Sequence, residues 1–210
     1  MEKNYVEYWD NNYTKHFSRE ITYDNWLDNY KDIIESCNST ILDLGCGAGN
    51  DTLYLIERNK NVLSCDYSQI ALDKVKQNIE GANTMLLDIS NLPYPFKDNT
   101  FEVIIADLTL HYFYEDTTFA IFKEIRRILT PNGVLLARVN AVSDTNFGAG
   151  NGTLLEENYY HVNGYNKRFF NEKDILKFFS IIGDVTFNEG LISRFGKPKS
   201  LFEIKVINKK

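Results

Sequence analysis

The chain has 210 residues, of which 43% are hydrophobic and 25% are charged, a composition typical of one folded globular domain. No apolar run approaches the roughly 20 residues that a membrane span needs, and the N-terminus lacks the basic and apolar regions of a signal peptide. The net charge of −6 argues against a broad nucleic-acid-binding surface, because phosphate binding relies on clustered lysine and arginine. We therefore expect a cytoplasmic protein with a single domain over residues 1–210.

The cysteines are too few and too scattered for a structural role in cross-linking or metal binding. Cys37, Cys46 and Cys65 form no C-x-x-C pair and have no neighbouring histidine cluster. The sequence therefore predicts neither a disulfide framework nor a metal site.

Residues 1–38 are rich in aromatic side chains. Trp26, Tyr30 and Ile33 recur at helical spacing, which predicts a helix leading into the first strand. The residues before Trp26 predict a short helix and a loop. We expect this segment either to fold over the open end of the sheet or to pack against the body of the domain.

Residues 40–55 predict a strand, a tight turn and a helix. The strand, residues 40–44, is short and almost wholly apolar, as in a parallel sheet covered on both faces. Alternating glycines follow, which permit a sharp turn and let a ligand approach the main chain. The helix should begin near Asn50, a good capping residue. A ligand is therefore expected at the C-terminal end of this strand.

The glycine spacing indicates which ligand. A dinucleotide fingerprint, G-x-G-x-x-G/A, would need its third glycine at Asn50, so that match fails. The stretch from Asp43 to Gly49 instead has the form acidic-x-G-x-G-x-G and resembles the first motif of the class I S-adenosylmethionine-dependent methyltransferases. An acidic strand end also suits a cofactor that carries an ammonium and a sulfonium. The resemblance implies that the methionine part of the cofactor is held by Asp43, Gly45, Cys46, Gly47 and Gly49.

Residues 61–65 predict a second strand that ends at Asp66 and Tyr67. Asp66 lies roughly 20 residues beyond the glycine turn, where nucleotide-binding α/β units place the carboxylate that accepts hydrogen bonds from ribose hydroxyls. We assign Asp66 to the ribose and place its neighbour Tyr67 in the same site.

Residues 83–87 predict a third strand that ends at Asp88 and Ile89. The resemblance implies that Asp88 receives the adenine amino group and that Ile89 lines the base. Asp88 could also simply cap the strand end.

Residues 101–106 predict a fourth strand, followed by Asp107 and His111. The resemblance places this strand end beside the transferred methyl, so we expect Asp107 near the amino-acid end of the cofactor or the acceptor. His111 could act as a general base, because its ordinary pKa near 6.5 suits that task, or could pack around the cofactor. The chain lacks the Asn/Asp-Pro-Pro-Tyr/Phe clamp of methyltransferases that act on adenine or glutamine amides.

The last third of the chain predicts a helix over residues 117–129, a strand over 134–139 and an irregular insertion over 140–168. We interpret the insertion as the substrate-side wall, with Tyr160 and His161 as candidates to contact the acceptor, or as surface decoration. A helix ending at Phe179 and two strands, near residues 185–188 and 200–206, should complete the domain.

These elements predict an α/β fold: one Rossmann-like, doubly wound domain whose mostly parallel sheet ends in a C-terminal antiparallel hairpin. The resemblance implies transfer of a methyl group from S-adenosylmethionine to a small-molecule acceptor by direct in-line displacement. We expect a monomer or homodimer, and the sequence leaves any metal requirement open. It also implies an aromatic N-terminal lid, here residues 1–38, over the cofactor. Overall similarity lies with the small ubiquinone-biosynthesis-like and tellurite-resistance-like groups. Two alternatives stay open, a non-catalytic sensor or partner subunit that binds S-adenosylmethionine or S-adenosylhomocysteine, and a methyltransferase with a protein or RNA acceptor.

Overall fold

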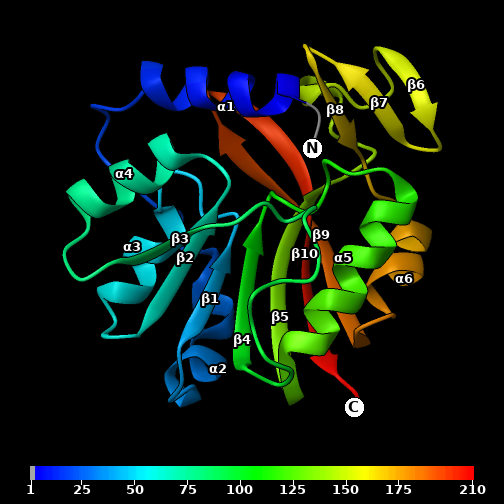
Figure 1. Cartoon of the computed structure of the whole chain (residues 1–210). Helices are drawn as coiled ribbons and strands as arrows, with labels where there is room; N and C mark the ends of the chain where they lie inside the picture. The colour runs from blue at the N-terminus through cyan, green and yellow to red at the C-terminus, as the bar shows by residue number, and fades with distance from the viewer. Residues whose placement is uncertain (1–2) are drawn as a thin grey trace.

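A seven-stranded sheet organises the computed structural model, which describes residues 3–210 and the side chains from residue 7 onward (Figure 1). Its strands lie in the order β3-β2-β1-β4-β5-β10-β9, and β10 runs antiparallel to both neighbours. Residues 1–2 of the expected lid lie outside the described residues. The strands are β1 (Ile41–Leu44), β2 (Val62–Asp66), β3 (Asn83–Leu86), β4 (Phe101–Asp107), β5 (Leu129–Asn140), β9 (Gly183–Arg194) and β10 (Lys197–Asn208).

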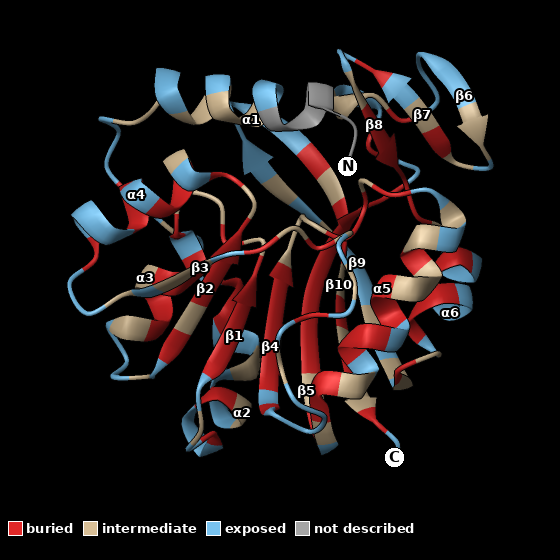
Figure 2. Ribbon diagram, in the orientation of Figure 1, coloured by how far each residue is buried: buried red, intermediate tan, exposed pale blue. Residues whose placement is uncertain are grey.

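Helices cover both faces of this sheet, because alternate strand residues point to opposite faces. In β4, Ile104 packs against α5 and α6, while Val103 and Ile105 pack against the segment that contains η1 and α2. Figure 2 shows the resulting buried layer on either side of the strands. The helical elements are α1 (Lys3–Lys15), η1 (Trp26–Tyr30), α2 (Lys31–Ser36), α3 (Asn50–Ile56), α4 (Gln69–Asn78), α5 (Glu115–Ile128), η2 (Thr145–Phe147) and α6 (Glu172–Phe179).

The turns at the helix starts follow from their residue types. Gly49 has a φ of 90° and precedes α3, and the hydroxyl of Ser68 accepts a hydrogen bond from the Ala71 N–H at the start of α4. At α6 the Asn171 side chain and Asp174 form a reciprocal capping box. These caps fix where each helix begins. Because β1 to β5 run parallel, their carboxyl ends meet at one edge of the sheet.

The predicted fold class is confirmed, with three local corrections. Residues 140–168 are not irregular: they contain η2 and a second, antiparallel sheet of β6 (Thr153–Glu156), β7 (Tyr159–Val162) and β8 (Tyr165–Arg168). The predicted helix before β1 divides into η1 and α2. The terminal strands β9 and β10 have 12 residues each, longer than predicted, because they pair with each other over their whole length. Exposed and half-buried residues alternate along β9, so it contains no long apolar run and its full length is not predicted from the sequence.

Within residues 3–210, no helix is both long and apolar enough to cross a membrane.

Candidate functional site

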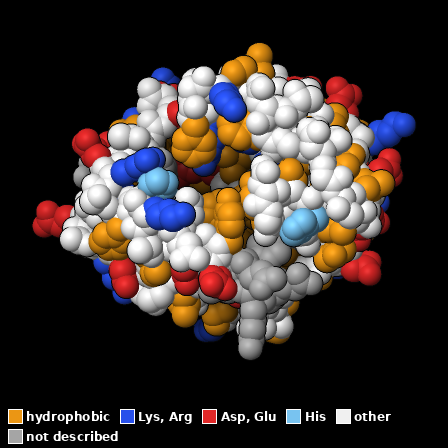
Figure 3. Space-filling model, turned by 90° about the horizontal axis from the view of Figure 1, so that it is seen from above, with side chains coloured by type: hydrophobic (Ala, Val, Ile, Leu, Met, Phe, Trp, Pro, Cys, Tyr) orange, Lys and Arg blue, Asp and Glu red, His pale blue; other side chains and the backbone are white. Residues whose placement is uncertain are grey.

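A cavity of about 340 Å³ lies at the carboxyl ends of β1, β2 and β4. The strand order reverses between β1 and β4, which is the position where open α/β sheets bind ligands. Helix α1 lies across the top of the sheet, and its Trp9 and Tyr13 line the cavity (Figure 1). Seen from above, the surface is hollowed at this point, with hydrophobic side chains inside the hollow (Figure 3).

The turn after β1 forms the floor of the site. Gly45 and Gly47 have φ values of 78° and 52°, in the left-handed region that favours glycine. A Cβ at Gly45 would collide with the Thr109 side chain, and one at Gly47 would lie 2.9 Å from the hydroxyl oxygen of Tyr13. Side chains therefore pack closely against the main chain at both glycines, and a larger residue at either position would collide with them.

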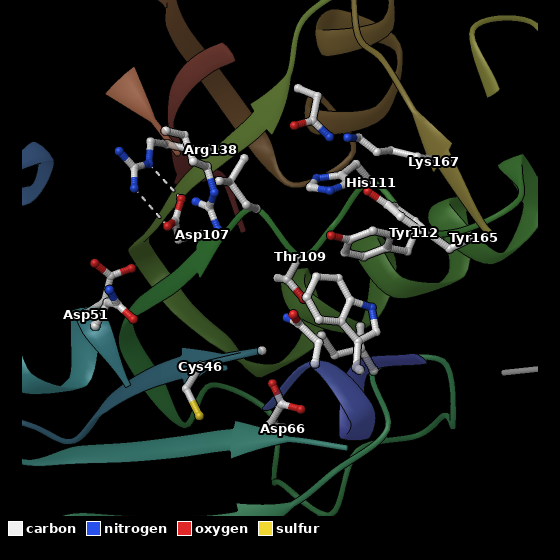
Figure 4. A pocket seen from close by; sticks show the side chains of 18 of the residues that line it. Cys46, Asp51, Asp66, Asp107, Thr109, His111, Tyr112, Arg138, Tyr165 and Lys167 are labelled. Carbon is white, nitrogen blue, oxygen red and sulfur yellow. Dashed lines mark hydrogen bonds and ion pairs between the residues drawn. The ribbon is translucent and has the colours of Figure 1, made fainter. Parts of the chain in front are cut away.

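Carboxyl groups gather on one side of the cavity, where Asp43, Asp51, Asp66 and Asp107 line it (Figure 4). Asp43 is 2% exposed, and its carboxylate accepts a hydrogen bond of 2.6 Å from the Thr52 hydroxyl. Burial, together with the charges of Asp107 and Asp66 and against the Thr52 hydrogen bond, raises the pKa of Asp43 to about 7. Burial likewise raises the pKa of Asp51, whose carboxylate accepts a hydrogen bond of 3.0 Å from the Trp26 indole. A cation bound here would relieve both penalties.

Asp66 is the last residue of β2, and its side chain is hydrogen-bonded to the glycine turn. Its carboxylate accepts hydrogen bonds of 2.9 Å from the N–H groups of Gly47 and Ser68. Burial raises the pKa of Asp66 to about 6, and these two bonds oppose the shift. The carboxyl therefore titrates close to neutrality.

Arg138, near the end of β5, is the basic partner of this acidic side. Its guanidinium donates to both carboxylate oxygens of Asp107, at 2.6 and 2.8 Å, and to Asp24 at 2.8 Å. Burial lowers the pKa of Arg138, but the two carboxylates raise it more, so it stays charged. It also lies over the Trp26 ring, 4.7 Å from its centroid. One guanidinium pairs with two carboxylates, and Asp43, Asp51 and Asp66 have no ion-pair partner among the described residues.

A buried histidine and basic side chains, rather than carboxylates, line the opposite side of the cavity. His111 is 1% exposed, and both of its ring nitrogens lack a hydrogen-bond partner among the described residues, as does Nδ2 of the buried Asn140. Burial lowers the pKa of His111 well below its ordinary value, and the charges of Lys167, Lys199 and Arg194 lower it further. His111 is therefore neutral at pH 7, beside Tyr112 at a ring distance of 4.2 Å.

Eight of the predicted site residues line this cavity: Asp43, Gly45, Cys46, Asp66, Tyr67, Ile89, Asp107 and His111. Gly47 and Gly49 shape the turn beneath it, since Cβ atoms there would meet Tyr13 and Val75. Asp88 lies outside the lining and accepts hydrogen bonds from the N–H and hydroxyl of Ser90. Tyr160 and His161 lie on β7 of the small sheet, also outside the lining, where His161 Nδ1 is 2.7 Å from Asn166.

Sequence reasoning did not assign Asp51, Arg138, Lys167 or Lys199 to the site, although all four line the cavity, as does Tyr13 of the predicted aromatic segment. Arg138 carried a usable signal, because a charged residue inside the apolar run 134–139 must have a buried partner. The two lysines gave none, since they come from β8 and β10 and meet only through the tertiary fold.

Among known protein families, the model described as "Methyltransferase domain" matches residues 42–137. A tRNA N(3)-cytidine methyltransferase METTL2 from Danio rerio is 30% identical over 161 residues, covering 70% of this chain and 45% of the relative. The chain spans between 30% and 55% of the length of the first curated relatives that it matches.

Solved structures show the same fold. A SAM-dependent methyltransferase from Methanosarcina mazei has a TM-score of 0.70 at 18% identity, covering 90% of this chain and 100% of that one. The Burkholderia thailandensis 1,6-didemethyltoxoflavin-N1-methyltransferase, solved with its acceptor and S-adenosylhomocysteine, has a TM-score of 0.67 at 15% identity, covering 100% of this chain and 91% of that one.

Over residues 42–137 the chain matches a methyltransferase domain, and its fold is that of solved class I S-adenosylmethionine-dependent methyltransferases. The cofactor of this class is S-adenosylmethionine, and the residues fit it. The left-handed turn at Gly45 brings the main chain to the cavity, and the excess of carboxylates over Arg138 suits a ligand with a cationic end.

Proposed function

We propose that the protein transfers the methyl group of S-adenosylmethionine to a ring nitrogen of a nucleobase in RNA. Bound S-adenosylmethionine supplies an electrophilic methyl on a sulfonium. We assign Asp43, Gly45 and Asp51 to its amino-acid end, Asp66 to the ribose and Ile89 to the adenine. These assignments rest on the position of each residue at the ends of β1, β2 and β3 and on the acidic character of that side of the cavity.

The proposed acceptor rests on one observation, the kind of residues that line the cavity opposite the carboxylates. There, Tyr112 and Tyr165 present aromatic surface, while His111 and Asn140 hold polar atoms without a partner among the described residues. A planar heterocycle could stack on the tyrosines, and these atoms could hydrogen-bond to a polar group that the acceptor carries. A ring nitrogen with a free lone pair needs no base, so a neutral His111 would hold the acceptor rather than remove a proton. Alignment of the two reactants can supply roughly 7–11 kcal/mol of the barrier reduction.

An RNA acceptor agrees with the tRNA cytidine methylation for which the METTL2 relative is named, and with the residues at the cavity mouth. Arg194 and Phe195 line the mouth, and Phe195 is 79% exposed at the turn between β9 and β10. An exposed aromatic ring beside a guanidinium is the arrangement on which single-stranded bases stack. Basic side chains also lie near the rim of the hollow (Figure 3). We propose that this rim holds the nucleotides that flank the target base.

A small-molecule acceptor is the second candidate, and a specific observation favours it. Helix α1 and β8 enclose the cavity through Trp9, Tyr13 and Tyr165, whose rings contact one another across the two elements. The enclosed space of about 340 Å³ can hold a cofactor and an acceptor together only if the acceptor is small. We propose that α1 is a lid in either case. Membership of the ubiquinone-biosynthesis-like or tellurite-resistance-like groups stays a prediction.

The test is a methyl-transfer assay with the full chain, methyl-labelled S-adenosylmethionine, and either unmodified tRNA transcripts or a cell extract freed of macromolecules. Digestion of the RNA to nucleosides and mass spectrometry should show a methylated nucleoside, at least tenfold more with the wild type than with Asp66→Asn. Asp73→Asn, an exposed change on α4, is the matched control. Label found only in the small-molecule fraction would reject RNA and support the second candidate.

A further inference from the structure

Basic side chains from distant parts of the chain converge on the acceptor side of the cavity. Lys167 of β8 and Lys199 of β10 are each no more than 4% exposed, and Arg194 stands exposed at the mouth. Figure 4 shows Lys167 beside His111, across the cavity from the carboxylates of Asp51 and Asp66. The two sides of one cavity thus carry opposite charge.

The two buried lysines are not equivalent. Lys199 Nζ lies 2.8 Å from a carboxylate oxygen of Asp144 and also donates to Oδ1 of Asn140, so its charge is paired. Lys167 Nζ donates only to the carbonyl oxygen of Phe147, at 3.0 Å, and has no carboxylate partner among the described residues. Buried charges are normally paired, because an unpaired one is costly to remove from water.

The charged groups around Lys167 explain its protonation. Burial together with the charges of Lys199 and Arg194, against the opposing charge of Asp144, lowers the pKa of Lys167 to about 7. Two titratable neighbours are neutral: His111, and Tyr165, whose ring centroid lies 5.7 Å from Lys167 Nζ and whose pKa is raised to about 12. A nearby anion would raise the pKa of Lys167 and favour its ammonium form.

Polar groups without a partner lie on the same wall. Nδ2 of Asn140 carries two hydrogens, and a neutral His111 ring carries one N–H, and none of these has a hydrogen-bond acceptor among the described residues. Buried polar groups in folded proteins are almost always hydrogen-bonded. The missing acceptors point to a ligand with several oxygen lone pairs.

We infer that the acceptor carries an anionic group, a carboxylate or a phosphate, that binds between Lys167, His111 and Nδ2 of Asn140. The anion would pair with the Lys167 ammonium and accept hydrogen bonds from the other two groups. The cavity would then hold the cationic end of the cofactor against carboxylates and the anionic end of the acceptor against lysine. This inference shares its cavity with the proposed function, but it holds for a nucleotide phosphate and for a small carboxylic acid alike.

The direct test is calorimetric titration of inorganic phosphate into the full chain saturated with S-adenosylhomocysteine. The wild type should bind phosphate saturably in the millimolar range at pH 6.5, and at least tenfold more weakly at pH 8.5, where Lys167 loses its proton. Lys167→Met should lose at least tenfold in affinity, while Lys167→Arg should stay within a few fold of the wild type. Lys123→Met, on the exposed face of α5, is the control for surface charge.

Two outcomes would overturn the inference: no saturable phosphate binding by the wild type, or equal binding by Lys167→Met and the wild type. Thermal unfolding establishes that each variant is folded, and Lys167→Gln replaces Lys167→Met if the latter is not. Loss of cofactor binding in the wild type would instead count against the methyltransferase assignment itself.

Paired ligands then distinguish the source of the anion. Cytidine 5′-monophosphate should bind tighter than cytidine if the group is a nucleotide phosphate, and benzoate tighter than benzamide if it is a carboxylate. No preference within either pair would contradict the inference, whatever the methyl-transfer assay shows with RNA.

Discussion

At the scale of single residues, the site is defined by carboxyl groups that the fold holds partly protonated. Burial raises the pKa of Asp43 to about 7 and that of Asp66 to about 6, both well above an ordinary aspartic acid. Neither group has a basic side chain as its hydrogen-bond partner among the described residues, since Asp43 pairs with Thr52 and Asp66 with backbone N–H groups. A bound cation would shift both toward the ionised form.

This predicts that cofactor binding releases protons. Because Asp43 and Asp66 are partly protonated in the free protein below about pH 7 and ionised in the complex, affinity for S-adenosylhomocysteine should rise with pH. We expect about a tenfold gain between pH 5.5 and pH 8, since each pKa unit corresponds to a factor of ten. Calorimetry at pH 6 in two buffers of different ionisation enthalpy should detect proton release, and affinity that is constant over this range would contradict the prediction.

The acidic side of the site could be predicted from the sequence because its residues lie at the ends of predicted strands. Asp43, Asp66 and Asp107 each follow an apolar run directly, so the parallel fold brings them to one edge. It could not find Lys167, which lies in a segment predicted to be irregular and reaches the cavity only because β8 folds back beside it. Local pattern therefore revealed the cofactor side, while the acceptor side depended on tertiary packing.

At the scale of elements, α1 covers the glycine turn. Its Tyr13 hydroxyl oxygen would lie 2.9 Å from a Cβ at Gly47, and its Trp9 ring packs 5.8 Å from the ring of Tyr112 on the far side of the cavity. The helix also contacts β8, where the Tyr8 and Trp9 rings pack on Tyr165, and the start of α4, where the Ser68 hydroxyl donates to Asp10 at 2.5 Å. Such an element can leave the site without disturbing the core.

Removal of the Tyr13 ring should therefore release the cofactor faster. We predict that Tyr13→Ala raises the dissociation rate of S-adenosylhomocysteine about tenfold, because water then reaches the glycine turn. Stopped-flow displacement measures this rate. Asn11→Ala, on the exposed side of the same helix, should leave it unchanged. If Tyr13→Ala dissociates at the wild-type rate, α1 is not a lid over the cofactor.

Arg138 joins two elements that are far apart in sequence. It holds Asp24, which precedes η1, against Asp107 at the end of β4, with Trp26 stacked on the guanidinium. Loss of one partner of a buried ion pair leaves an uncompensated charge. We predict that Arg138→Met lowers the free energy of unfolding by about 3 kcal/mol, measured by urea denaturation. Arg126→Met, on the exposed face of α5, should change it by less than about 0.5 kcal/mol; an equal effect of both would show that the ion pairs do not matter.

The elements themselves were largely predictable where apolar periodicity is strong, as in β1, β4 and α5. The small sheet β6-β7-β8 was not, because its strands have 4 residues each and mix exposed with buried positions. Hydrogen bonds between these strands, rather than burial of a continuous apolar face, define that sheet. Short polar strands of this kind give no periodic signal.

At the scale of the whole molecule, the charge is unevenly placed. The net charge is −6, yet the cavity mouth carries the exposed Arg194 and the nearby Lys197. An RNA acceptor would therefore meet few cations. We predict that the logarithm of the RNA association constant falls with the logarithm of the salt concentration with a slope of about −2 or shallower. Arg194→Gln should reduce this slope by about 1, while Arg126→Gln should not. A slope near −6 would contradict a single basic rim.

Calorimetric titration of S-adenosylhomocysteine into the wild type and Asp66→Asn tests the central claim most directly, because Asp66 joins the glycine turn to the end of β2 and lines the cavity. We predict micromolar binding by the wild type at pH 8 and at least a thirtyfold loss in Asp66→Asn, with Asp73→Asn unchanged. Absence of binding by the folded wild-type protein would contradict the account and leave only its fold.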